Sequence, residues 1–197
     1  IESMTSDQEA FKDFRTFLYY VWTEHLELPA PTDVQNDMGL YLQHGPKRVI
    51  IECFRGAGKT WVTAAYCCWV LLFRPQWSIL IVSATATHAE NVSRFMLQLV
   101  KTVPELAPLQ PREGERASVV QWDAGPAKSD VAPTVRIAGI NGTITGGRAD
   151  LIIADDIEVS TNSRTQTMRD KNSEAVKEFD AILKPREECR VVFLGTP

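Results

Sequence analysis

A short segment, residues 53–60 with the sequence CFRGAGKT, has the residue types and spacing of a phosphate-binding loop. Gly56 and Gly58 allow the backbone to curl, so that successive N–H groups point at phosphate oxygens. Lys59 would then reach the β- and γ-phosphates of a nucleotide, and the Thr60 hydroxyl would bind Mg²⁺. The motif usually begins with glycine, whereas this segment begins with a cysteine.

Carboxylates follow a second apolar run, residues 151–154. Asp155 would end a buried strand, where an acid of the Walker B type holds Mg²⁺ through water, and a following carboxylate would polarise the attacking water. Asp156 and Glu158 both fit the role of this base, and the sequence leaves the two as alternatives. Acids are common at strand ends, but the two motifs together predict a P-loop NTPase.

The elements around these motifs alternate between strand and helix after an all-helical start. Short apolar runs predict buried strands at residues 49–54, 78–84 and 151–154, the first of them buried on both faces. Further strands are predicted at 134–140, followed by a turn, and at 190–195. Helical spacing of apolar residues, with capping boxes at Ser6/Glu9 and Thr87/Glu90, predicts helices over residues 6–22, 33–44, 61–73, 87–103 and 163–183. Residues 105–133 are expected to be irregular, with one strand candidate at 118–122. This order predicts a mostly parallel sheet covered on both sides, a three-layer α/β/α sandwich.

Composition narrows the class of protein. The chain has 197 residues and a net charge of −4, which predicts one soluble domain and excludes a generally basic, histone-like protein. A local basic patch for nucleic acid stays compatible with this charge. The apolar stretch over residues 61–73 is shorter than the ~20 residues of a membrane span, so we expect a buried helix and no membrane partner. The cysteines form no CxxC pair, which argues against a zinc site: Cys53, Cys67, Cys68 and Cys189.

The segments FRGAGKT, LIIADDIE and FLGTP together resemble the large terminase subunit of tailed bacteriophages, closest to the branch found in short-tailed phages. The resemblance covers essentially all 197 residues. It implies a RecA-like P-loop fold of the additional-strand class and a single ATPase domain, with a helical N-terminal segment at 1–46 and the P-loop core at 47–197. A nuclease domain follows in that family, and we expect this chain to lack it.

The resemblance also implies roles for further residues. Gln35 matches the adenine-reading Q motif, and Thr196 matches the coupling motif that senses the γ-phosphate. Arg55 in cis and Arg148 in trans are alternatives for the arginine that stabilises transition-state charge. A structural role for either, in a pair with Asp150 or a nearby carboxylate, stays open. The implied catalytic set is Lys59, Arg55, Arg148, Asp156 and Glu158, with Thr60 and Asp155 at the metal. The implied ATP-binding set is Gln35, Arg55, Gly56, Ala57, Gly58, Lys59 and Thr60.

The implied function is ATP hydrolysis, with Mg²⁺, that drives double-stranded viral DNA into a procapsid. The implied partners are DNA, a homo-oligomeric ring on the portal protein, the small terminase subunit and the nuclease domain, in the host cell cytoplasm and outside the mature virion. Two alternatives remain. The first is one lobe of a superfamily 2 helicase, but a helicase core needs two lobes. The second is a nucleotide-binding switch that does not hydrolyse, but such a protein would be expected to lack the base, and two candidate bases are present.

Overall fold

The computed structural model describes residues 9–128 and 130–197. A six-stranded sheet has the order β1-β6-β5-β2-β4-β3, and only β3 runs antiparallel to its neighbour. The strands are β1 (Arg48–Glu52), β2 (Ile79–Ser83), β3 (Gln121–Trp122), β4 (Val135–Gly139), β5 (Leu151–Asp155) and β6 (Arg190–Gly195). The helices are α2 (Phe14–Tyr20), η1 (Val21–His25), α3 (Asp33–His44), α4 (Lys59–Phe73), α5 (Ala86–Thr102), η2 (Pro104–Leu109) and α6 (Gln166–Ile182).

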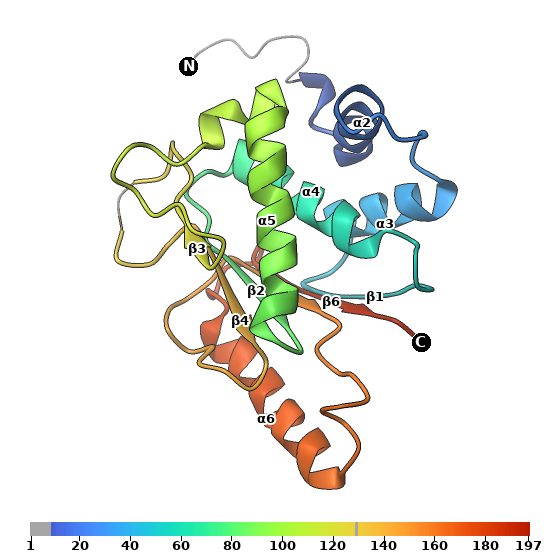
Figure 1. Ribbon diagram of the computed structural model, residues 1–197, viewed down its shortest axis with the longest axis vertical. Helices are drawn as coiled ribbons and strands as arrows, with labels where there is room; N and C mark the ends of the chain where they lie inside the picture. Colours follow the sequence, from blue (N-terminus) through green and yellow to red (C-terminus); the bar gives the residue numbers. More distant parts are fainter. Residues whose placement is uncertain (1–8, 129) are drawn as a thin grey trace.

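Helices cover both faces of the sheet (Figure 1). Successive side chains of a strand point to opposite faces, and the two faces of β5 show this directly. Leu151 and Ile153 belong to the larger core, which also contains α2, α3, α4 and α5. Ile152 and Ala154 belong to the smaller core under α6. The expected three-layer α/β/α sandwich with a mostly parallel sheet is therefore confirmed.

Strand β6 lies between β1 and β5, the strands that precede the two motifs. This is the arrangement of the additional-strand class. All three strands are parallel, so their carboxyl ends meet at one edge of the sheet. The loop at residues 53–58 and the acids at 155–156 follow β1 and β5 at that edge. The topology alone therefore brings the two sequence motifs together.

Two predictions about helix ends are wrong. The first helix is not continuous to Trp22, because a turn at residues 11–13 interrupts it and Asp13 caps a new start at α2. Ser6 lies outside the described residues. Helix α5 begins after Thr85, whose side chain accepts a hydrogen bond from the backbone of His88, and not after Thr87. Thr85 and Thr87 are both suitable capping residues, separated by Ala86, and the helix uses the earlier one.

Strand β1 is not buried on both faces as predicted. Its residues alternate between exposed and buried, and Ile50 is 65% exposed. The reason is its place at the end of the sheet. Val49 and Ile51 pack under the larger helical layer. The smaller core under α6 includes Val191 of β6 but no residue of β1.

Arginine side chains hold two long connections in place: the segment between η2 and β4, and the crossover from β4 to β5. In the segment expected to be irregular, Gln121 and Trp122 form the one strand among its described residues. There Arg116 pairs with Asp123 at 2.8 Å and donates to the backbone carbonyl of Val131. In the crossover from β4 to β5, Arg136 donates to the carbonyls of Ile144 and Gly147, at 3.1 and 2.9 Å. The crossover is therefore fixed to the sheet at these two points.

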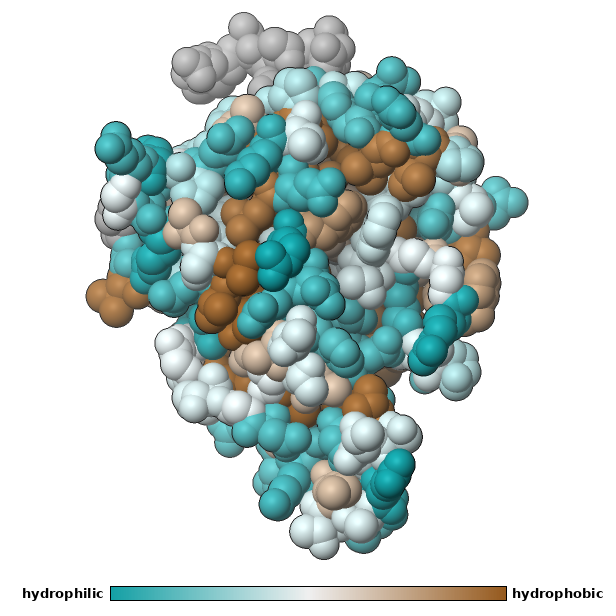
Figure 2. Space-filling model, viewed as in Figure 1, coloured by the Kyte–Doolittle hydropathy of each residue, from teal (hydrophilic) through white to brown (hydrophobic). Residues whose placement is uncertain are grey.

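The surface is mixed in hydropathy. Figure 2 shows hydrophobic residues in separate patches beside α5, whereas the projecting end of the α6 region is mostly hydrophilic or neutral. Among the described residues, no helix combines the length and apolar character that crossing a membrane requires. Helix α4, formed by the longest apolar stretch, has ten buried residues, as predicted for a core helix.

Asp150 gives a first prediction. Its side chain is fully buried before β5, where one oxygen accepts from the backbone and hydroxyl of Ser78 and from Lys184, at 2.8, 3.1 and 2.7 Å. We expect Asp150→Asn to lower the free energy of unfolding by about 3 kcal/mol, because it leaves a cation without its buried partner. Asp180→Asn, which removes an exposed partner of Arg48, should cost less than about 1 kcal/mol. Urea unfolding of both variants measures the free energy of unfolding. An equal decrease in the two variants would contradict the role given to the buried Asp150.

Candidate nucleotide-binding site

The segment between β1 and α4 is built as a phosphate-binding loop. Gly56 and Gly58 have φ angles of 93° and 79°, in the left-handed region that side chains disfavour. Gly58 is the residue before α4, so the loop opens directly into the N-terminus of a long helix. A Cβ atom on Gly58 would lie 2.9 Å from Nε2 of Gln35. The backbone angle therefore favours glycine at this position, and a side chain there would also displace the amide of Gln35.

Lys59 lies at the centre of the site. It is 8% exposed, its ammonium is 3.2 Å from a carboxylate oxygen of Asp156, and it donates a hydrogen bond to the hydroxyl of Thr196. That hydroxyl lies 3.2 Å and 3.3 Å from the two carboxylate oxygens of Asp156 and can donate to either. Residues that follow β1, β5 and β6 thus meet in one hydrogen-bonded group.

Asp155 and Thr60 form a second pair. The Thr60 hydroxyl donates to one oxygen of Asp155 at 3.0 Å, while the other oxygen, Oδ1, is buried without a hydrogen-bond partner in the described part of the chain. Burial raises the pKa of this carboxyl above its ordinary value. The hydroxyl of Ser83 fixes the strand end by donating to the carbonyl of Asp155 at 2.8 Å. A free, buried carboxylate oxygen beside a hydroxyl is a donor set that suits a divalent cation.

The structure separates the two candidate bases. Asp156 has a φ of 44°, and its backbone N–H donates to the carbonyl of Leu194 at 3.0 Å. A left-handed aspartate is uncommon, and here it turns the carboxylate toward Lys59. Glu158 is exposed and does not line the cavity at this site. In this structure Asp156 is therefore in the site and Glu158 is outside it.

A cavity of about 520 Å³ opens over the loop. Its walls include residues from four separate parts of the chain: Trp22, Leu28 and Gln35 near the N-terminus, residues 54–61, Asp156, and Thr196. Sequence reasoning missed Trp22, Leu28, Phe54 and Trp61. Phe54 and Trp61 flank the motif directly, so their place could have been inferred from it. Trp22 and Leu28 carry no local signal, because only the packing of the N-terminal helices brings them here.

Gln35, for which the resemblance implies adenine reading, lies beside the loop and lines the cavity. Its side-chain nitrogen donates to the carbonyl of Ala57 in the loop at 3.1 Å, and its side-chain oxygen accepts from the backbone of Thr32 at 3.0 Å. Thr32 in turn caps α3. One carboxamide thus links the start of α3 to the phosphate-binding loop and lines the same cavity.

The two candidate arginines lie apart. Arg55 is exposed and lines the cavity. Arg148 precedes β5, so it lies at the opposite edge of the sheet, where it lines a different cavity with Lys184. In the described part of the chain Arg148 makes no ion pair, and the charged partners of Asp150 are Lys184 and Arg186. The structural pairing of Arg148 with Asp150 is therefore wrong, and its own chain does not bring Arg148 to the nucleotide cavity.

Comparisons with known proteins agree with this geometry. A family model described as "Terminase large subunit, T4likevirus-type, N-terminal" matches residues 51–179. The large terminase subunit of Enterobacteria phage T3 is 46% identical over 186 residues, which are 94% of this chain but 32% of that protein. The chain thus spans about a third of the length of this relative.

Solved structures show the same fold at low identity. The large terminase of bacteriophage HK97 superposes with a TM-score of 0.55 and 16% identity, over 85% of this chain and 34% of that one. The large terminase ATPase domain of Thermus phage P74-26 gives a TM-score of 0.51 and 19% identity, over 89% and 68%. The resemblance to a short-tailed-phage terminase is confirmed by the family match and the T3 relative. The chain belongs to the terminase large subunit family and represents its N-terminal part.

Proposed function

We propose that this chain binds ATP with Mg²⁺ and hydrolyses it, as the motor domain that drives double-stranded DNA into a procapsid. One observation supports this proposal above all. Lys59 contacts both Asp156 and Thr196, next to the hydrogen-bonded pair Thr60–Asp155 and directly after the glycine loop. The walls of the cavity suit a nucleotide, with apolar and aromatic side chains for the base and a cationic end for the phosphates.

The residues present fit Mg²⁺. Thr60 and Asp155 would hold it, since they offer a hydroxyl and a buried carboxylate oxygen that lacks a partner. When bound, Mg²⁺ supplies charge neutralisation for the β- and γ-phosphate oxygens. Burial raises the pKa of Asp155, so we expect metal binding to weaken as the pH falls toward that pKa, because the protonated carboxyl is a poor ligand.

The next step in the proposed reaction is that Lys59 exchanges its contact with Asp156 for a contact with phosphate. When a phosphate enters, the Lys59 ammonium can contact its oxygens in place of Asp156. The Asp156 carboxylate is then free to accept a proton of the attacking water, while the water oxygen bonds to the γ-phosphorus and the bond to the β,γ-bridging oxygen breaks. Thr196 contacts both Lys59 and Asp156, so its strand end would register whether the γ-phosphate is present.

The proposal includes further partners, in the host cytoplasm. They are DNA, other copies of this chain in a ring on the portal protein, the small terminase subunit, and the nuclease domain of the longer family polypeptide. Stimulation of hydrolysis by procapsids would support packaging. Stimulation by free single strands would favour a helicase-like role instead.

The loop lysine tests the assignment of the site. We expect Lys59→Ala to reduce phosphate release from ATP by ~10²-fold or more, because it removes a charge-assisted phosphate contact. Lys101→Ala, an exposed lysine at the end of α5, serves as the control and should keep full activity. Circular dichroism checks that both variants fold. Turnover at the wild-type rate in a folded Lys59→Ala protein would remove the phosphate-loop assignment.

The base is identified by a pair of amide variants. Asp156→Asn should leave MgATP binding intact and slow turnover by ~10²-fold or more, as expected for a residue that activates water. Asparagine also tolerates the left-handed backbone at this position, so the loop should keep its shape. Glu158→Gln should have a milder effect, because Glu158 lies outside the cavity. Single-turnover kinetics measures both, and a reversed order would make Glu158 the base.

We further propose that Arg148 acts on the nucleotide of a neighbouring subunit. Arg148→Ala should spare ATP binding by the isolated chain, since it lines a cavity at the other edge of the sheet. In assembled oligomers it should abolish hydrolysis, because such arginines contribute ~10³–10⁵ in rate in other P-loop enzymes. Mixing with Lys59→Ala subunits should restore some activity, at contacts that join an intact Arg148 to an intact loop. Absence of rescue at every ratio, with assembly confirmed, would assign Arg148 another role.

A further inference from the structure

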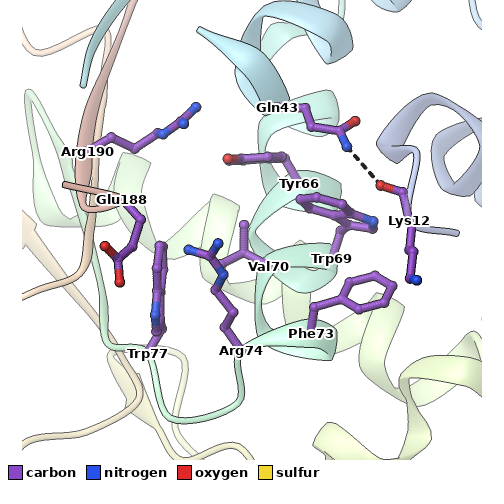
Figure 3. Close-up of a pocket in the computed structure, with 10 residues that line it drawn as sticks. All are labelled: Lys12, Gln43, Tyr66, Trp69, Val70, Phe73, Arg74, Trp77, Glu188 and Arg190. Atoms are coloured by element: carbon purple, nitrogen blue, oxygen red, sulfur yellow. Dashed lines mark hydrogen bonds between the residues drawn. The ribbon is translucent and has the colours of Figure 1, made fainter. Parts of the chain in front are cut away.

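A second enclosed site lies at the opposite edge of the sheet from the phosphate-binding loop. The C-terminal half of α4 and the start of β6 line a cavity of about 250 Å³ there, together with residues of the N-terminal segment (Figure 3). We call it the aromatic cavity and define it by Tyr66, Trp69, Arg74, Trp77, Glu188 and Arg190. None of these residues lines the nucleotide cavity, so the inference does not depend on the proposed function.

The aromatic walls are held in place. The centre of the Trp69 ring lies 5.7 Å from the ring centre of Tyr66 and 5.4 Å from that of Phe73. The indole N–H of Trp69 donates to the carbonyl of Phe11 at 2.6 Å. The guanidinium of Arg74 lies 4.3 Å from the ring centre of Trp77. Such fixed tryptophan and arginine side chains lose little conformational freedom when a ligand binds, which is why they dominate protein interfaces.

The cavity also contains a polar group without a protein partner. Tyr66 is 4% exposed and lines the cavity. Its hydroxyl has no hydrogen-bond partner among the described residues, and it is not one of the fully buried atoms without a partner, so it is open to a ligand in the cavity. Figure 3 shows this hydroxyl pointing across the cavity toward the side of Arg190. Burial raises the pKa of Tyr66 to about 12, so the hydroxyl stays protonated and can donate. Arg190 uses one N–H on the carbonyl of Leu42 and keeps others free.

Charge indicates what would bind. Arg74 and Arg190 line the cavity with the carboxylate of Glu188, in a chain whose net charge is −4. Lys12 also lines it, but its ammonium is paired with Glu9 at 2.7 Å. An anionic ligand is therefore favoured. A nucleic-acid strand fits less well, since its phosphates would meet Glu188 and the cavity has room for little more than one side chain. A peptide offers separate carboxylates and N–H groups, so it can satisfy the arginines, Tyr66 and Glu188 together.

We propose that the aromatic cavity docks an acidic peptide segment of a partner protein. One apolar or aromatic side chain of that segment packs against Trp69 and Trp77, and a neighbouring carboxylate pairs with Arg74 or Arg190 and accepts a hydrogen bond from Tyr66. The interaction is that of a single anchor residue in a preformed pocket, reinforced by charge at its rim.

Fluorescence anisotropy with labelled peptides tests the proposal. The probes are pentapeptides Glu-Asp-X-Asp-Glu, where X is Leu, Met, Phe, Tyr or Trp, and the matched neutral peptides Gln-Asn-X-Asn-Gln. The protein variants are Arg74→Glu and Tyr66→Phe, with Arg94→Glu as the charge-matched control on the exposed face of α5. Thermal unfolding followed by circular dichroism checks that each variant is folded.

At least one acidic peptide should bind saturably, and its neutral counterpart should bind ~10-fold more weakly or not at all. Arg74→Glu should weaken binding by ~10-fold or more, and Tyr66→Phe by about 5-fold, the value of one hydrogen bond. Arg94→Glu should change nothing. The proposal is overturned if no acidic peptide saturates, or if Arg94→Glu weakens binding as much as Arg74→Glu. Tighter binding of a ten-residue thymidine oligonucleotide, with the same sensitivity to Arg74→Glu, would assign the cavity to nucleic acid instead.

Discussion

The parallel pairing of β1, β6 and β5 is the constraint on which the nucleotide site depends. The register sets Glu52 beside Gly195 and Asp155 beside Leu194. The residues that follow these positions therefore leave the sheet at the same level: the glycine loop, Asp156 and Thr196. On the other side of β5, the hydroxyl of Ser83 in β2 donates to the carbonyl of Asp155 and holds the end of that strand in place. A one-residue slip of β6 would move Thr196 away from Lys59 and break the group, because alternate residues of a strand point to opposite faces.

Within that frame, the buried ammonium of Lys59 must always have an anionic or polar partner. Removing a charge from water without one costs several kcal/mol, so a nucleotide-free site needs a substitute for phosphate. Asp156 and Thr196 provide it. The same contacts mean that a bound phosphate changes the surroundings of both residues. In the proposed function, nucleotide occupancy would be linked to the end of β6 by these contacts, without a long-range pathway.

How much of this could be predicted from sequence depends on how local each feature is. The glycine loop, Lys59 and Asp155 were correctly placed at one sheet edge, because each belongs to a short motif with a strand on one side. The prediction that β1 is buried on both faces was wrong, since an apolar run does not reveal which strand lies at the end of the sheet. Trp22 and Leu28 reach the cavity only through the packing of the N-terminal segment. Proximity in sequence is also a poor guide to position here: Arg148 precedes β5 and Asp155 ends it, so the two residues lie at opposite edges of the sheet.

That separation has a consequence for assembly. The cations at the nucleotide cavity are Lys59 and Arg55, both from its own loop, whereas Arg148 lies at the far edge. If Arg148 contacts a nucleotide, that nucleotide is bound to another copy, whose loop edge must face this copy's opposite edge. Two different surfaces then meet at every contact, which is a heterologous interface. Such an interface leaves one edge free on each end of any short assembly, so it is satisfied everywhere only when the copies close into a ring.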